Sequence, residues 1–130
     1  MANVRATIGN DHYKTVLTTN TNTLIADEPL HAEGTDLGFA PNELLASALA
    51  SCTAITLRMY ADRKEWPLQQ VDVVVTFQRD NELNISNMSR SIELHGQLSQ
   101  EQRERLLQIA NQCPIHKSLT NPISIVTKLV

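Results

Sequence analysis

"LLASALASCTAITL", residues 44–57, is the stretch that decides the fold, because it runs for 14 residues without a charged side chain. Pro41 stands just ahead of it, and proline suits the first turn of a helix, where its missing N–H costs no hydrogen bond. Charged residues return at Arg58, and Pro67 cannot continue a helix. The sequence therefore predicts a helix that starts near residue 41, ends before Pro67 and is buried on every side.

The composition argues against two classes of partner. A membrane-spanning helix needs about 20 apolar residues, and the uncharged stretch is shorter and carries Ser and Thr, so we expect no membrane association. The net charge is −3, from 11 Lys and Arg against 14 Asp and Glu, and no basic stripe is present, so we expect no nucleic-acid binding. The start, "MANVRATIGNDHYKT", has no apolar signal region, which predicts a cytoplasmic location.

Strand patterns lie on both sides of this helix. Alternating apolar residues at 4–8 and 13–17 flank a turn at 9–11 and predict a β-hairpin, followed by a short strand near 24–25. Alternation returns at 71–79, with Val71, Val73, Val75 and Phe77 on one face, and at 91–95, and we expect these two strands to pair as an antiparallel ribbon. The last residues, 123–130, are also typical of a strand.

A second helix is expected at 100–112. Ser99 and Gln102 form a capping-box pattern ahead of it, and Pro114 ends it. The order of strands, helix, strands, helix and strand indicates a single α+β domain over residues 1–130. Because one sheet and one other helix cover an uncharged helix only partly, the sequence also predicts a homodimer.

The chain has two cysteines, Cys52 and Cys113, 61 positions apart. Cys113 follows the apolar residues of the second helix and is expected to face inward at its end. Cys52 is expected to share the core face of the first helix with Leu45, Ala48, Leu49, Ile55, Thr56 and Met59.

Two inward thiols leave three interpretations open. A permanent disulfide is not expected in a reducing cytosol. The thiols are then inert packing residues, a reversible redox pair, or ligands of a metal site in which Cys113 and His116 join Cys52 and either His31 or His95.

The segments around the cysteines favour the redox pair. "APNELLASALASCTAITLRMYADRKEWPL" at 40–68 and "CPIHKSL" at 113–119, in this order and at this spacing, resemble the osmotically inducible protein C and organic hydroperoxide resistance (OsmC/Ohr) family of thiol peroxidases. The resemblance extends from "ADEP" at 26–29 to the C-terminal strand. It implies an OsmC-like α+β fold, with antiparallel sheets wrapped around two central helices in an intertwined homodimer.

The resemblance also implies a chemistry. Cys52 would be the peroxidatic thiol, which an organic hydroperoxide oxidises to a sulfenic acid, and Cys113 the resolving thiol, which traps it as a disulfide. A dithiol or a lipoylated protein would return the pair to the reduced state, without a metal or another cofactor. The apolar residues expected around Cys52 would favour organic hydroperoxides over hydrogen peroxide.

The residues expected to activate Cys52 depart from the family pattern. The family's glutamate would fall at position 42, which is Asn here, so Glu43 is the candidate carboxylate. Nine helical steps place Glu43 about 180° around the helix from Cys52, so it either orients a cation of the other subunit or interacts with the helix N-terminus. The family also supplies an arginine that activates the thiol, and Arg5, the one arginine ahead of Arg58, is either the N-terminal candidate for this role or a solvent-exposed residue of the first strand.

His116 is a further candidate near the resolving cysteine. It either supplies a proton or a charge beside Cys113 or caps the carbonyl groups of the helix end. The alternative to an enzyme is a non-catalytic dimeric module that binds a small hydrophobic ligand in the same pocket.

Overall fold

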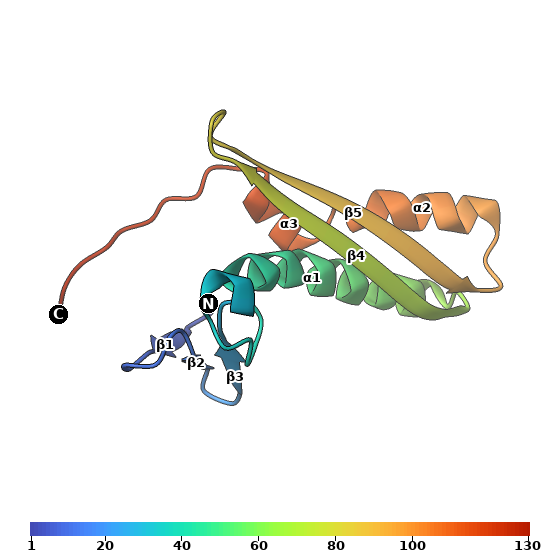
Figure 1. Cartoon of the computed structure of the whole chain (residues 1–130). Helices are drawn as coiled ribbons and strands as arrows, with labels where there is room; N and C mark the ends of the chain where they lie inside the picture. Colours follow the sequence, from blue (N-terminus) through green and yellow to red (C-terminus); the bar gives the residue numbers. More distant parts are fainter. The chain divides into compact units, whose positions relative to one another are not determined.

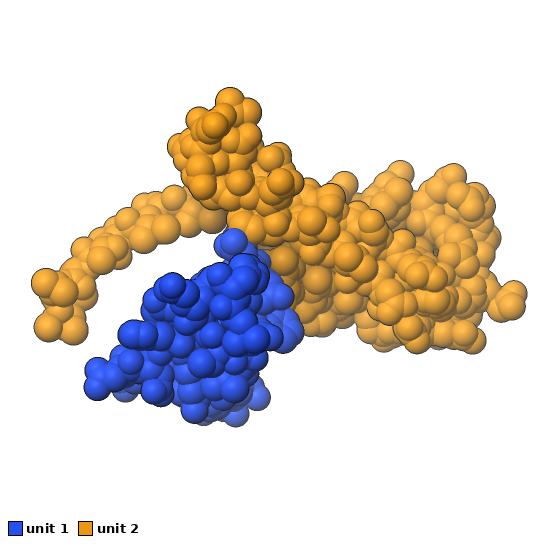
Figure 2. Space-filling view, viewed as in Figure 1, with its two compact units in different colours: residues 1–45 blue, residues 46–130 orange.

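The structure, a computed structural model, describes all residues from 1 to 130. The chain divides into two compact units, residues 1–45 and residues 46–130, coloured separately in Figure 2. Helix α1, Pro41–Lys64, begins in the first unit and continues in the second. Whether the two units act as the single domain predicted for residues 1–130 stays a prediction.

The N-terminal unit contains a three-stranded antiparallel sheet in the order β1-β2-β3. Its register pairs Arg5 with Thr18 and Thr15 with Ala26. The predicted hairpin and short third strand are therefore confirmed. A short 3-10 helix, η1, follows in the loop toward α1. The bounds are β1 Arg5–Thr7, β2 Thr15–Thr18, β3 Thr23–Ala26 and η1 Leu30–Ala32.

Asp27 organises the loop after β3, a role that the sequence did not reveal. Its side chain is buried, and its carboxylate accepts hydrogen bonds from the hydroxyl of Thr35 at 2.5 Å and from four backbone N–H groups. These donors, the Thr35 hydroxyl foremost, hold the pKa of Asp27 well below its usual range. The backbone donors belong to Tyr13, Glu28, Thr35 and Leu37.

The C-terminal unit is built on an antiparallel ribbon of two strands, β4 (Leu68–Asp80) and β5 (Ile85–Gly96). Figure 1 shows the ribbon running along α1, with α2 (Gln100–Ala110) and α3 (Pro114–Leu119) following it in the chain. The half-buried residues of β4 alternate as predicted. However, β5 starts six residues before the predicted position 91, because Ile85 already pairs with Asp80. The polar side chains of this exposed end hid the strand pattern.

One face of α1 carries the core of this unit. Its buried residues recur every fourth position, and the core cluster adds three residues of α2. The prediction that α1 is buried on every side is wrong for the single chain, because Ile55 is 54% and Met59 65% exposed. The ribbon and α2 cover one side only. The buried residues of α1 are Leu49, Thr53, Leu57 and Ala61, and those of α2 are Leu106, Ile109 and Ala110.

The whole of α1 is longer than its uncharged stretch. It has 24 residues with a mean hydropathy of 1.4 in its most apolar window, so it is long and apolar enough to cross a membrane by length and composition alone. The expectation that this helix is too short to span a membrane is therefore wrong. Core helices of soluble proteins meet the same criterion. The side of α1 that carries Ile55 and Met59 is exposed in the chain.

Helix α2 begins as predicted. The Ser99 hydroxyl accepts a hydrogen bond from the Gln102 backbone N–H at 3.1 Å, and the Gln102 side chain accepts one from the Ser99 N–H at 2.9 Å. The helix ends at Ala110, two residues before the predicted end. Helix α3 follows and was not predicted, because Pro114 also suits the first turn of a new helix, with Cys113 as its N-cap.

The C-terminal residues differ from the prediction. Residues 121–130 form no strand, and only two sheets, β1-β2-β3 and β4-β5, are present (Figure 1). The predicted strand at 123–130 is therefore wrong for the single chain. Its alternating apolar side chains are exposed, Ile125 at 83% and Leu129 at 101%, because no neighbouring strand pairs with this segment.

Candidate functional site

The C-terminal unit brings its two thiols together. Cys52 lies on α1 and Cys113 at the start of α3, and both are free thiols. Cys113 is fully buried, whereas Cys52 is half-buried. Burial first, and then a hydrogen bond and a charge interaction with Cys52, raise the pKa of the Cys113 thiol. The two thiols therefore interact with each other.

The position of Cys52 on α1 differs from the predicted one. The buried face contains Leu49 and Thr53, so Cys52 lies one residue, or about 100°, away from Thr53. Ile55 and Met59, which were expected to share the core face with Cys52, are exposed. Cys52 therefore lies at the edge of the core, where a reagent reaches it more readily than it reaches Cys113.

Cys113 is held by its own helix. Its Sγ accepts a hydrogen bond from the His116 N–H at 3.3 Å, and the N–H groups of His116 and Ile115 lower the pKa of the thiol. This effect is smaller than that of burial, so the pKa remains raised overall. The thiol is thus positioned by the backbone, and burial raises its pKa.

An arginine that the sequence interpretation missed also reaches these segments. Arg90 of β5 donates from Nη1 to the Thr53 hydroxyl at 3.0 Å, and from Nη2 to the Asn111 side-chain oxygen at 2.8 Å. Nη1 is also 3.3 Å from the Ala110 carbonyl oxygen, and Nη2 is 3.5 Å from Nδ1 of His116. The strand pattern could have identified Arg90, because it lies two residues before Ile92 and therefore on the same, inward face of β5.

The other predicted candidates lie in the N-terminal unit, whereas the thiols belong to the C-terminal unit. Arg5 is exposed on β1, and His31 is exposed in η1. The Glu43 carboxylate accepts a hydrogen bond from the Ala40 N–H at 2.8 Å. Glu43 thus interacts with the start of α1, one of its two expected roles, and its part in the thiol chemistry stays a prediction.

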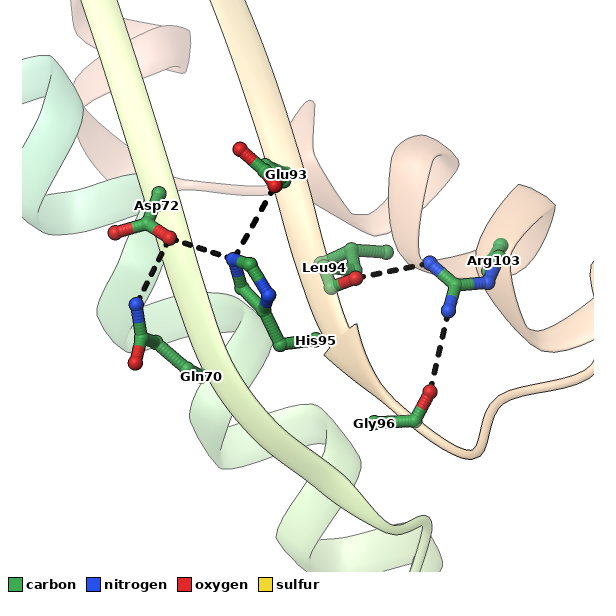
Figure 3. Close-up of polar contacts among 7 residues, drawn as sticks. All are labelled: Gln70, Asp72, Glu93, Leu94, His95, Gly96 and Arg103. Carbon is green, nitrogen blue, oxygen red and sulfur yellow. Dashed lines mark hydrogen bonds and ion pairs between the residues drawn. The ribbon is translucent and has the colours of Figure 1, made fainter.

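His95 lies among carboxylates on the outer face of the ribbon (Figure 3). Its Nε2 is 2.7 Å from Asp72 Oδ2 and 3.5 Å from Glu93 Oε1. Gln70 also donates to Asp72 at 2.9 Å, and the contacts with Gln70 and His95 lower the pKa of Asp72. Asp72, Glu93 and His95 are the three side chains whose ligand atoms cluster closely enough for a metal ion. The alternative metal site, Cys52, Cys113 and His116 with either His31 or His95, does not appear as such a cluster.

The profile of the OsmC-like protein family matches residues 34–128, which include both cysteines. The chain belongs to the OsmC-like protein family. The predicted family and α+β fold are thus confirmed. A comparison with curated proteins finds no match.

Solved structures of the family share this fold. An OsmC-like protein from Mycoplasma pneumoniae is 20% identical, with a TM-score of 0.80 over 92% of this chain and 87% of that one. The organic hydroperoxide resistance protein OsmC from Legionella pneumophila is 20% identical, with a TM-score of 0.66 over 92% and 88%. The organic hydroperoxide resistance protein OhrB of Bacillus subtilis is 20% identical, with a TM-score of 0.62 over 91% and 89%. At these identities the likeness shows the fold alone.

Proposed function

We propose that the chain is a cysteine-based thiol peroxidase that reduces organic hydroperoxides to alcohols. The observation that carries the proposal is the contact between the only two thiols of the chain, Cys52 and Cys113. Two of the similar structures are named as organic hydroperoxide resistance proteins, which supports the same chemistry.

The exposures of the thiols support distinct roles. Cys52 is the half-buried one, so a peroxide reaches it first. Cys113 is fully buried and its pKa is raised, which makes it a poor first nucleophile. Cys52 is therefore the proposed peroxidatic thiol and Cys113 the resolving one.

The reaction balances with these two groups. The Cys52 thiolate attacks one peroxide oxygen, so that an S–O bond forms and the O–O bond breaks. The alkoxide leaves and takes up a proton as the alcohol, while Cys52 becomes a sulfenic acid. The Cys113 thiolate then attacks the Cys52 sulfur, and hydroxide leaves and takes up the thiol proton as water. A dithiol or a lipoylated protein of the cytoplasm reduces the resulting disulfide.

A second copy of the chain is the proposed cover for the apolar surface that one chain leaves exposed. This surface includes Ile55 and Met59 of α1 and the alternating apolar residues of 123–130. Serine and threonine recur along α1, which favours a protein cover over lipid. Sedimentation at micromolar concentration is expected to give the mass of a dimer, and a monomer would contradict this part of the proposal.

The peroxidase proposal is tested by single-turnover oxidation. One equivalent of cumene hydroperoxide is expected to remove two hydrogens from the wild-type mass. Cys113→Ser is expected to gain one oxygen and then more, because its sulfenic acid is not trapped. Cys52→Ser is expected to show no turnover with a dithiol reductant, and turnover that survives in this variant would refute the proposal.

One observation favours the alternative, a non-catalytic module for a small hydrophobic ligand. A hollow of about 470 Å³ lies beside α1, with Ala54, Ile55 and Val71 among its lining residues, but neither cysteine lines it. Under this alternative an apolar probe binds there, and both thiols stay reduced after exposure to peroxide at neutral pH. The mass measurement therefore separates the two functions.

A further inference from the structure

Arg90 occupies an unusual place for a cation. The half-buried positions of β5 include 88, 90 and 92, whereas 89 and 91 are exposed. Arg90 therefore shares the inward face of the ribbon with Met88 and Ile92, beside the core. A charged group at such a position costs free energy unless hydrogen-bond partners compensate it. The hydrogen-bond partners of Arg90 therefore indicate the role of this side chain.

These partners come from the two chain segments that carry the thiols. Thr53, which accepts from Nη1, directly follows Cys52, and Asn111 and His116 lie two residues before and three residues after Cys113. The guanidinium has a planar, rigid fork of donors, which a lysine cannot reproduce. One side chain of β5 thus joins α1 to the α2–α3 junction, the two segments that carry the cysteines.

None of these partners is a carboxylate. Arg90 bonds to a hydroxyl, an amide oxygen, a backbone carbonyl and an imidazole nitrogen, and it takes part in none of the three ion pairs of the C-terminal unit. Its positive charge is therefore not compensated by a carboxylate. A positive charge in a half-buried region favours the thiolate over the thiol of a nearby cysteine.

We propose that Arg90 is a positioning residue for disulfide formation: it holds the segments of Cys52 and Cys113 together and carries a positive charge that none of its hydrogen-bond partners pairs with a carboxylate. This inference rests on the proposed function. The step concerned is the attack of the Cys113 thiolate on the Cys52 sulfur, in which an S–S bond forms and an S–O bond breaks. Arg90 acts through its neighbours, so it is distinct from the two reacting cysteines.

The test uses dithionitrobenzoate instead of a peroxide, so that disulfide formation is measured apart from peroxide reduction. This reagent is a disulfide, and the thiolate that it releases is coloured. Cys52 attacks the reagent and releases the first coloured thiolate, and Cys113 then attacks the mixed disulfide and releases the second. Arg90→Gln is expected to slow the second release roughly ten- to hundredfold, as misplaced reacting groups do, with less effect on the first. Arg103→Gln is the matched control, because Arg103 also joins a helix to β5, at the Leu94 and Gly96 carbonyls (Figure 3). It is expected to keep the wild-type rate.

Asn111→Asp isolates the charge, because it turns the acceptor 2.8 Å from Nη2 into a carboxylate. The Arg90 guanidinium stays in place, but the new carboxylate compensates its charge. The positive charge then favours the Cys113 thiolate less, so the pH midpoint of the second release is expected to move upward. Asn111 is exposed at the end of α2, so this variant gives a readout even where Arg90→Gln does not fold.

Two outcomes would overturn the inference: a wild-type second release in folded Arg90→Gln, or an unchanged pH midpoint in Asn111→Asp. A wild-type chain that reacts with the reagent but not with cumene hydroperoxide would instead refute the proposed function alone. The rates of Arg90→Gln and Asn111→Asp with the reagent would then still test the role of Arg90.

Discussion

Replacing Thr53 by valine tests the link between α1 and Arg90. The Thr53 side chain is fully buried, donates to the Leu49 carbonyl at 2.7 Å and accepts from Arg90 at 3.0 Å. Valine keeps most of the volume but removes the acceptor. A hydrogen bond to a charged group contributes about 1.5–3 kcal/mol. Because Nη1 retains the Ala110 carbonyl at 3.3 Å, we expect the lower end, a loss of about 1.5 kcal/mol in the free energy of unfolding.

The assay is urea unfolding followed by circular dichroism, arranged as a double-mutant cycle. The four proteins are the wild type, Thr53→Val, Arg90→Met and the double variant. Groups in direct contact show coupling energies of about 0.5–3 kcal/mol, and we expect about 1 kcal/mol for this pair. If Thr53→Val costs the same with and without Arg90, the coupling is zero. The hydroxyl would then act through Leu49 or through packing, and our account of the link would be wrong.

Two further predictions concern stability. Leu106→Ala is expected to lower the free energy of unfolding by about 2–5 kcal/mol in urea titrations, because it opens a cavity in the core cluster, whereas Leu107→Ala, at an exposed position, should change it by less than about 0.5 kcal/mol; equal losses would contradict the described core. Because the pKa of Asp27 is lower in the folded chain than in the unfolded one, its contribution to the stability of the N-terminal unit is present above roughly pH 4 and is lost as the pH falls through the folded-state value. Amide chemical shifts of Tyr13 and Leu37 followed during acid titration should report this loss, and the same acid response in Asp27→Asn would refute it.

The sequence correctly predicted the helices and strands that are defined by patterns among residues close together in the chain. The capping box at Ser99 and the alternation from Val71 onward need only near neighbours, so both were read correctly. The full length of β5 was missed, because its exposed end carries polar side chains on both faces. Helix α3 was missed because a proline marks the end of one helix and the start of the next equally well.

The candidate site was predicted only in part. The pair of thiols followed from the family motifs, but Arg90 did not, because it is 37 residues from Thr53 in sequence and the two meet only through the ribbon. Asp27 was missed for a similar reason, since its donors are spread from Tyr13 to Leu37. The proposed cover of α1 and of residues 123–130 by a second copy would not be a property of one chain, so no local pattern defines it.

The turn that joins β4 to β5 has a practical use. Residues 81–84 project at the tip of the ribbon (Figure 1), and Leu83 is 69% exposed there. Arg90 is five residues beyond Ile85, or roughly 17 Å along the strand at about 3.4 Å per residue. Exposed turns of this kind accept inserted sequence. An epitope placed between Asn81 and Asn84 would let the protein be detected without altering the segments that carry Cys52 and Cys113.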